Sequence, residues 1–275
     1  MRLRSQLIPW KVAGRLTERE RDTDRVVRET GWVFNNETGE TLTLAEFVAT
    51  GDAEVPVYWE AFGLERPDDD ARTLVEIGSG IGRMTCEFTR RYGSVYACDL
   101  DGGFLERCRE AVSRFGHVDR LQTIEVTDGR SLAVPDRTAD VTFSYITLQH
   151  CEREDALALV SEAVRVTKPG GRIVLNFRAW GAADPLLLPA GAAIRGLFRV
   201  PAVGTWLSRR RWATRLAWQA NRLDPVQVLR HLNGQVGDTT VWRNPQRQAA
   251  IARADRVASF EVINPNHWWL VATVA

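Results

Sequence analysis

The sequence contains very little lysine and few cysteines. Only two of its 36 basic residues are lysines, Lys11 and Lys168, so arginine carries nearly all of the positive charge. The formal net charge is only +1, which argues against a protein that coats nucleic acid through its overall charge. The four cysteines show no paired metal-ligand spacing, so we expect reduced thiols instead of disulfides or zinc ligands.

Long apolar runs are also absent. No stretch approaches the roughly 18 consecutive apolar residues that a membrane span requires. The first residues, MRLRSQLIPWK, lack the apolar run of a signal peptide. We therefore expect a cytoplasmic protein without a transmembrane segment. The hydrophobic fraction of 44% is ordinary for a globular protein and gives no sign of disorder.

From residue 67 onward, short apolar segments alternate with helical patterns. The segments expected to form strands are 73–77, 94–100, 121–126, 139–146 and 171–177, closed by 239–243 and 267–275. Strands that alternate with helices indicate βαβ units and a parallel sheet. The predicted fold class is therefore α/β, a doubly wound, mostly parallel sheet of seven strands with helices on both faces.

Two further regions lie outside this alternation. Residues 1–66 are expected to form an N-terminal helical extension, in which 44–50 and 55–62 are two short amphipathic helices separated by Gly51-Asp52. Residues 67–275 are expected to form the main domain. Within it, 181–222 are predicted to be a helical insert after the fifth strand, and a connection of this length is usually functional.

The most informative motif is LVEIGSGIGRMT, residues 74–85. Gly78, Gly80 and Gly82 are expected to form the turn from a strand into a helix, where the backbone can approach a ligand closely. A dinucleotide-binding turn has G-x-G-x-x-G, but Arg83 occupies the position of its third glycine. Glu76, two residues before the first glycine, suits a ligand that carries an ammonium group, such as the methionine end of S-adenosylmethionine.

Three later segments follow in the order that such a fold requires. Asp99 ends the second strand, where a carboxylate can accept both ribose hydroxyls. Asp128 follows the third strand, where it can accept from the exocyclic amine of adenine, although Thr-Asp-Gly is also an everyday turn. DVTFSYITLQH then runs off the fourth strand, and RVTKPGGRIVL enters the fifth.

Together these segments resemble a class I S-adenosylmethionine-dependent methyltransferase, of the broad group that includes the ubiquinone/menaquinone-biosynthesis type enzymes, over roughly residues 70–180. The resemblance implies a Rossmann-like fold, S-adenosylmethionine as cofactor, S-adenosylhomocysteine as product, and no metal. It also implies that the backbone near Ser144 and Tyr145 faces the methionine part. The other cofactor contacts that it implies are Glu76, Gly78, Gly80, Gly82, Asp99, Leu100, Asp128 and Gly129.

His150 is the histidine that follows the fourth strand, at the edge where open α/β sheets bind ligands. Methyl transfer from a sulfonium is an in-line displacement, and an oxygen nucleophile of high pKa also needs a base, a role that a neutral imidazole can fill. His150 is therefore a candidate general base, or a residue that only positions the acceptor. His117, His231 and His267 have no motif around them and are expected at the surface or in packing.

The favoured function is methylation of a hydroxyl on a small-molecule acceptor. Methylation of nitrogen or carbon, on a small molecule or a protein, is an alternative. A non-catalytic binding module is another, and Arg83 disfavours an NAD(P)-dependent oxidoreductase. Nucleic acid is not expected, because no RNA-binding module and no N/D-P-P-Y/F motif is present. A homodimer is compatible with the sequence. Gln149, Arg209, Arg210 and Arg211 are candidates for the acceptor side. The nearly uncompensated arginines of the insert suggest a lid over an anionic or lipid-like acceptor, and a packed helical cap is the alternative.

Overall fold

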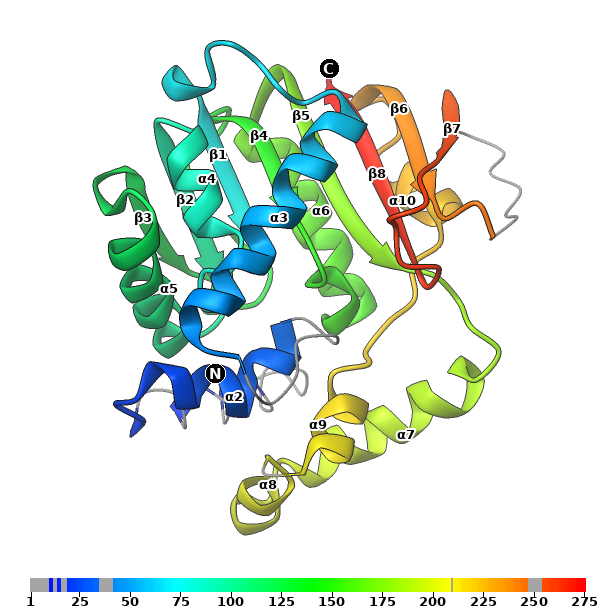
Figure 1. The fold of residues 1–275 in the computed structure, drawn as a ribbon. Coiled ribbons are helices and arrows are strands. Elements are labelled where there is room, and N and C mark those ends of the chain that lie inside the picture. The colour runs from blue at the N-terminus through cyan, green and yellow to red at the C-terminus, as the bar shows by residue number, and fades with distance from the viewer. Residues whose placement is uncertain (1–9, 12–13, 16–18, 35–41, 209, 247–253) are drawn as a thin grey trace. The chain divides into compact units, whose positions relative to one another are not determined.

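The computed structural model describes residues 10–11, 14–15, 19–34, 42–208, 210–246 and 254–275 (Figure 1). The chain divides into two compact units, each considered separately below. The N-terminal unit comprises Ala13–Thr127 and Leu132–Val134. The C-terminal unit comprises Pro135–Ala275 together with Met1–Val12 and Asp128–Ser131.

The N-terminal unit contains three parallel strands in the order β3-β2-β1. Thr73 pairs with Ser94 at the start of β1, and Val95 pairs with Leu121 at the start of β3. The strands carry the buried core, because all residues of β1 after Thr73 are buried. The elements are α2 (Thr23–Phe34), α3 (Leu44–Phe62), β1 (Thr73–Ile77), α4 (Thr85–Arg91), β2 (Ser94–Asp99), α5 (Gly102–Phe115) and β3 (Leu121–Glu125), with 3-10 turns at Asp69–Ala71 and Val118–Arg120.

The C-terminal unit contains five strands in the order β4-β5-β8-β6-β7. β4 and β5 are parallel, as are β6 and β7, whereas β8 runs antiparallel to both β5 and β6. The elements are β4 (Ala139–Ser144), a 3-10 turn (Leu148–His150), α6 (Arg153–Val166), β5 (Thr167–Arg178), α7 (Asp184–Leu197), α8 (Pro201–Ser208), α9 (Arg211–Ala217), α10 (Pro225–His231), β6 (Val236–Arg243), β7 (Arg256–Ser259) and β8 (His267–Val274).

The α/β class and the parallel strands 1 to 5 agree with the sequence prediction, but the strand count does not. The described residues contain eight strands instead of seven, because Arg256–Ser259 forms β7 beside β6. β5 is also longer than expected, since it begins at Thr167 and includes the Lys-Pro-Gly-Gly segment. In β7 only Ala258 is even partly buried, so the hydrophobic pattern typical of a core strand is missing there.

The expectation of two short helices before residue 63 was wrong. A single helix, α3, runs through both segments and contains Gly51 and Pro56 in its interior. A Cβ atom on Gly51 would lie 2.1 Å from the carbonyl oxygen of Arg83. The glycine therefore allows α3 to pack against the turn before α4 and does not mark a break between helices.

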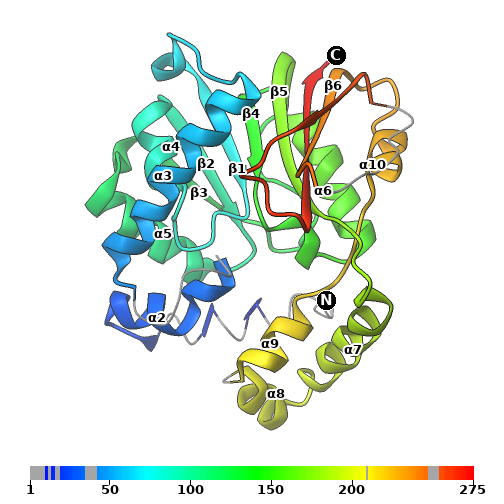
Figure 2. The same cartoon turned by 45° about the vertical axis from the view of Figure 1, so that its right-hand side comes forward.

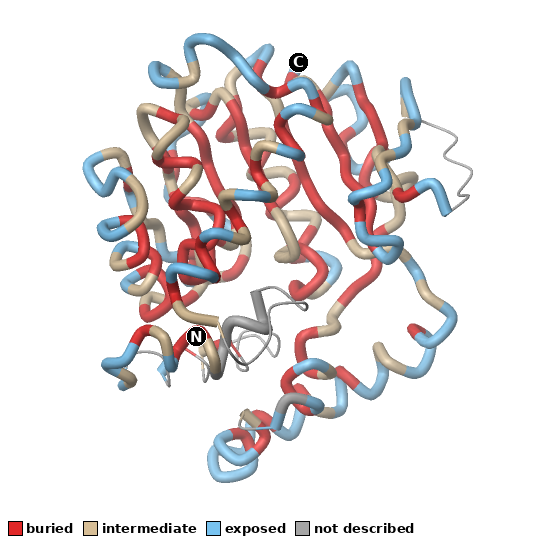
Figure 3. The backbone as a smooth tube through the Cα atoms, in the orientation of Figure 1, coloured by how far each residue is buried: buried red, intermediate tan, exposed pale blue. Residues whose placement is uncertain are grey.

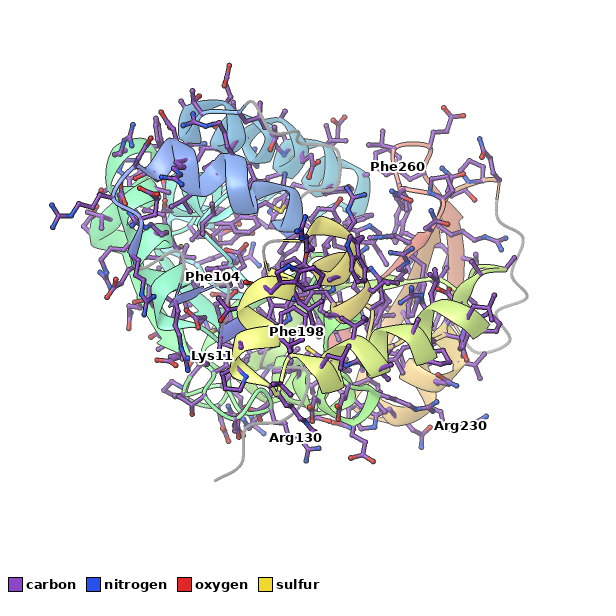
Figure 4. The ribbon with its side chains drawn as sticks, turned by 90° about the horizontal axis from the view of Figure 1, so that it is seen from below. Lys11, Phe104, Arg130, Phe198, Arg230 and Phe260 are labelled. Atoms are coloured by element: carbon purple, nitrogen blue, oxygen red, sulfur yellow. The ribbon has the colours of Figure 1, made fainter. Side chains whose placement is uncertain are left out.

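The insert after β5 is helical, as predicted, and consists of α7, α8 and α9 (Figure 2). Phe198, labelled in Figure 4, lies between α7 and α8 and is only 2% exposed. Much of α7 and α8 is exposed in Figure 3, and Leu186 is 80% exposed. In the part of the chain that the structure describes, no helix is long and apolar enough to cross a membrane.

Candidate active site of a transferase fold

The glycine turn of the N-terminal unit has the backbone geometry that the motif predicts. Gly78, Gly80 and Gly82 have φ values of 84°, 56° and 94°, which side chains with a Cβ rarely adopt. The backbone N–H groups of Gly78 and Ser79 both donate to the carbonyl oxygen of Cys98, at 2.7 and 3.1 Å. The turn is therefore held against the end of β2, and the chain continues from it into α4.

Glu76 is buried near the end of β1 and is only 4% exposed. Its Oε2 accepts a hydrogen bond of 2.6 Å from the hydroxyl of Thr85, the first residue of α4. Burial raises the pKa of the Glu76 carboxyl to about 7, because the loss of water outweighs the lowering effects of the Thr85 hydroxyl and the Arg83 charge. A buried carboxylate of this kind is best compensated by a cationic ligand.

Asp99 ends β2 and shapes the glycine turn. Its Oδ2 accepts the backbone N–H of Gly80 at 2.9 Å, and its Oδ1 accepts that of Asp101 at 3.4 Å. Burial raises the pKa of Asp99 to about 6, and the backbone N–H groups of Gly80, Asp101 and Leu100 counteract part of that rise. The carboxylate of Asp99 thus lies beside the backbone of the glycine turn. Leu100, the next residue, is half-buried.

Arg83 replaces the third glycine of a dinucleotide turn and is buried. Its Nη1 forms a 2.9 Å ion pair with Glu54 and a 3.3 Å hydrogen bond with Thr50, both on α3. A residue at this position therefore links the helix behind the turn to α3. This interaction explains why a long, charged side chain is accommodated where a dinucleotide fold requires glycine for close helix–strand packing.

In the C-terminal unit, Asp128 forms the turn that the sequence left open as an alternative. Its Oδ1 accepts the backbone N–H groups of Arg130 and Ser131 at 2.8 and 2.9 Å, and its Oδ2 accepts the Ser131 hydroxyl at 2.8 Å. Burial acts to raise the pKa of Asp128, but these hydrogen bonds outweigh it and the net pKa is lowered. Gly129 follows with φ 71°. Both oxygens have local partners, although Oδ2 keeps lone-pair capacity for another donor.

The same turn is anchored to α6. Arg130, labelled in Figure 4, forms an ion pair through its Nε with the completely buried Asp155 near the start of that helix. Its Nη2 lies 3.4 Å from Glu154. The turn that contains Asp128 and Gly129 is therefore held against the start of α6.

The end of β4 is held by a buried amide on β5. Asn176 Oδ1 accepts the backbone N–H of Ile146 at 3.3 Å and lies 3.0 Å from Nδ1 of His267 on β8. Ile146 has φ 51°, which is unusual for a β-branched residue. The chain thus turns sharply after Ser144, which is buried, and Tyr145, whose ring stacks on Trp269 at 5.1 Å. Their backbone lies at the carboxyl end of β4.

His150 ends the 3-10 turn that follows β4 and is 9% exposed. Its Nδ1 lies 2.6 Å from the carbonyl oxygen of Trp218, which can only accept, so Nδ1 carries the hydrogen and Nε2 carries the lone pair. The pKa of His150 is lowered to about 4, mainly by burial and also by the charges of Arg178 and Arg222, although the hydrogen bond to the Trp218 carbonyl acts to raise it. The ring is neutral near pH 7 and presents a hydrogen-bond acceptor.

Gln149 contacts the same imidazole from the preceding position. Its side-chain Nε2 lies 3.4 Å from Nε2 of His150, while its Oε1 is buried without a hydrogen-bond partner among the described residues. Trp10 closes this region, stacked on Trp218 at 4.3 Å and edge-on to His150 at 5.3 Å. The Trp10 ring therefore covers one side of the imidazole, consistent with the lowered pKa of His150.

The arginines proposed for the acceptor side are described only in part. Arg209 lies outside the described residues, as does the side chain of Arg211. Arg210 is exposed, and its guanidinium lies 5.0 Å from the ring centroid of Trp206. Their role in acceptor recognition stays a prediction.

Four polar residues near His150 were not singled out from the sequence. They are Asn176, Arg178, His267 and the ion-paired Arg222. The available signal was the pattern Leu-Asn-Phe-Arg at the end of an otherwise apolar strand, because polar groups at the carboxyl end of a buried strand often face a ligand. His267, expected to be a surface or packing residue, is buried and bonded to Asn176.

Comparisons with known proteins agree with this geometry. A family model described as a methyltransferase domain matches residues 75–175. The demethylmenaquinone methyltransferase of Thermobifida fusca is 34% identical over 121 residues, which are 43% of this chain and 49% of that protein. The malonyl-[acyl-carrier protein] O-methyltransferase of Yersinia pestis is 29% identical over 113 residues, which are 41% of this chain and 39% of that protein. The chain thus spans less than half the length of these curated relatives.

A solved structure extends the similarity to the fold of most of the chain. The phosphoethanolamine N-methyltransferase 2 of Haemonchus contortus, solved with S-adenosylhomocysteine and phosphomonomethylethanolamine, aligns with a TM-score of 0.50 and 18% identity. The alignment covers 83% of this chain and 45% of that chain. With the matched family model and the glycine turn, residues 75–175 are a class I S-adenosylmethionine-dependent methyltransferase domain of Rossmann-like fold.

Proposed function

We propose that this chain transfers the methyl group of S-adenosylmethionine to a hydroxyl of a small-molecule acceptor. The observation that carries the cofactor assignment is the pair of carboxylates beside the glycine turn, buried Glu76 and half-buried Asp99. Asp99 is positioned by the N–H of Gly80 and would accept the ribose hydroxyls. Glu76, whose pKa is raised by burial, would lie near the ammonium end of the cofactor. Leu100 would flank the cofactor, and the glycine backbone would approach it closely.

The cofactor supplies the electrophilic methyl group when it is bound, and the chain supplies alignment. In the C-terminal unit, Ser144, Tyr145, Asp128 and Gly129 are proposed cofactor contacts by resemblance. His150 offers Nε2 as an acceptor for the hydrogen of an attacking hydroxyl. Because its pKa is lowered to about 4, His150 is a weak base, so we assign it to positioning that hydroxyl. As the bond from oxygen to the methyl carbon forms and the bond from that carbon to sulfur breaks, S-adenosylhomocysteine leaves as a neutral thioether and the hydroxyl proton passes to water. The side-chain Nε2 of Gln149 lies 3.4 Å from the same imidazole nitrogen, so this side chain would move away from Nε2 of His150 when the acceptor binds.

The preference for oxygen over nitrogen rests on His150. A neutral imidazole acceptor suits a hydroxyl donor, which carries one hydrogen to give. The names of the relatives include both O- and N-methyltransferases, so they do not decide between the two. The atom that is methylated is therefore identified from the product itself.

The test uses S-adenosylmethionine with a ¹³C-labelled methyl group and a fractionated small-molecule extract. The labelled product is isolated by mass spectrometry, and its ¹³C chemical shift distinguishes an O-methyl from an N-methyl or C-methyl group. We expect an O-methyl signal. A labelled N-methyl or C-methyl product would contradict the acceptor assignment. Binding of S-adenosylhomocysteine without any labelled product across a broad extract would favour a non-catalytic module.

A further inference from the structure

Arg178 is the last residue of β5 and lies at the carboxyl end of that strand. It pairs in register with His267 of β8, and it follows Asn176 by two positions, so the three side chains share one face of the sheet. The side chain is half-buried. Within the part of the chain that the structure describes, its guanidinium forms no hydrogen bond and no ion pair.

The charged groups around Arg178 leave one positive charge in excess, because Asp184 attracts Arg178 but forms its ion pair with Arg222. Arg222 is completely buried and pairs with both oxygens of Asp184, at 3.0 Å from Nε and 2.8 Å from Nη2. The backbone N–H of Gly181 also donates to Asp184, at 2.7 Å. Asp184 and Arg222 therefore cancel one another, and the charge of Arg178 is left over.

The two histidines beside it carry no charge near pH 7. Burial lowers the pKa of His150 to about 4 and that of His267 to about 3, and the charge of Arg178 contributes to both shifts. Burial also lowers the pKa of Arg178 itself, and the nearby Arg222 adds to that effect, whereas the charge of Asp184 acts to raise this pKa. The ion pair, the two neutral rings and Arg178 thus form a region with one uncompensated positive charge next to the end of β4.

We propose that Arg178 binds an anionic group, a carboxylate or a phosphate, of the methyl acceptor. A guanidinium presents a planar fork that matches either group in a bidentate arrangement. Holding such a charge partly out of water without a partner destabilises a fold, so its retention is explained by a ligand that supplies the partner. The proposal rests on the proposed function for the identity of the ligand as an acceptor, but the anion site itself can be tested alone.

The position also fits the reaction. Arg178 pairs with His267, whose Nδ1 lies 3.0 Å from Asn176 Oδ1. The same oxygen accepts the backbone N–H of Ile146, in the turn that leads to His150, to which we assign the acceptor hydroxyl. An acceptor that carries both an anionic group and a hydroxyl would therefore be held at two points on the same unit. Two fixed points orient a small molecule far better than one, which is what an in-line displacement requires.

The experiment measures binding of inorganic phosphate and of acetate by calorimetry, with the full chain saturated with S-adenosylhomocysteine. The variants are Arg178→Gln, Arg178→Lys and the matched control Arg172→Gln. Arg172 is a half-buried arginine of the same strand, but it donates to the Thr273 hydroxyl at the other end of the β5–β8 pairing. We expect Arg178→Gln to weaken binding of at least one anion by about 10- to 100-fold, as expected for a lost charge-assisted hydrogen bond. Arg178→Lys should lose less, and Arg172→Gln should match the parent.

The comparison of the two anions distinguishes a phosphate-bearing from a carboxylate-bearing acceptor. Arg178→Gln should keep its S-adenosylhomocysteine affinity and have an unchanged or higher Tm, because an uncompensated charge has been removed. The proposal is overturned if the parent binds neither anion, if Arg178→Gln binds both as the parent does, or if the variants lose stability without any selective loss of anion binding. Failure of the parent to bind S-adenosylhomocysteine would refute the proposed function separately.

Discussion

The imidazole of His150 donates its Nδ1 hydrogen to the carbonyl oxygen of Trp218, 2.6 Å away. This bond joins the turn after β4 to the segment that returns from the helical insert. The same return segment is held by Asn221, whose side-chain amide donates to the carbonyl oxygens of Leu148 and Cys151 at 2.7 and 2.6 Å. The orientation of the imidazole is therefore set by the insert, and Nε2 is left as its hydrogen-bond acceptor.

The first prediction follows from that orientation. His150→Gln retains a side-chain acceptor, so turnover should stay within about tenfold of the parent, whereas His150→Ala should lose about 100-fold or more. Both variants should bind S-adenosylhomocysteine as the parent does. If the Gln variant is as inactive as the Ala variant while methyl transfer limits the rate, His150 acts as a proton acceptor and the positioning assignment fails.

Glu76 predicts a pH dependence of cofactor binding. Burial raises its pKa to about 7 in the free protein, and a bound ammonium group favours the charged carboxylate, so binding should release protons. Affinity for S-adenosylhomocysteine should therefore fall as the pH drops from about 7.5 to 5.5. Calorimetry in buffers of different ionisation enthalpy measures the protons released, and Glu76→Gln should release fewer.

The same pKa has a consequence for the stability of the free protein. A carboxyl whose pKa is raised on folding stabilises the folded state fully below its ordinary value, and this contribution is lost as the pH rises through about 7. Glu76→Gln should therefore flatten the decline of Tm between about pH 5 and 8 in the absence of cofactor. An identical decline in parent and variant would show that Glu76 is not the titrating group.

Gly51 tests the packing of α3 against the glycine turn. Gly51→Ala places a Cβ about 2.1 Å from the carbonyl oxygen of Arg83, so we expect a loss of about 1–3 kcal/mol in the free energy of unfolding. Gly196→Ala in α7 is the control, because nothing lies within 4 Å of its added Cβ. The control should gain up to about 1 kcal/mol from helix propensity. Denaturant unfolding measures the free energy of unfolding of both variants. An equal gain in this free energy at both positions would contradict the close contact between Gly51 and Arg83.

The succession of strands along the chain and the glycine turn could be predicted from sequence because both depend on local patterns. Apolar segments of five to eight residues predicted β1 to β4, and the glycines at 78, 80 and 82 have the positive φ values that the motif requires. The two-helix expectation before residue 63 failed because Gly51 was interpreted as a helix break. Its actual cause is a contact with Arg83, 32 positions away, which no local pattern reveals.

The proposed anion-binding role of Arg178 and the bond from His150 to Trp218 could not be predicted from the sequence. Each depends on which strand ends and insert segments the fold brings together. His150 was identified by its place after a strand, but its neutral state depends on burial and on Arg178 and Arg222, and neither is visible as a motif. The turn around Asp128, by contrast, was anticipated as an alternative, since Asp followed by Gly is a local signal.

The central claim is that the domain binds S-adenosylmethionine through the carboxylate of Asp99, and calorimetry with S-adenosylhomocysteine tests it most directly. Asp99→Ala should weaken binding by about 1.5–3 kcal/mol, the range for losing charge-assisted hydrogen bonds. Asp140→Ala is the control, because this aspartate forms its ion pair with Lys168 on β5. Undiminished affinity in a folded Asp99→Ala variant, or no binding by the parent protein at all, would contradict the account.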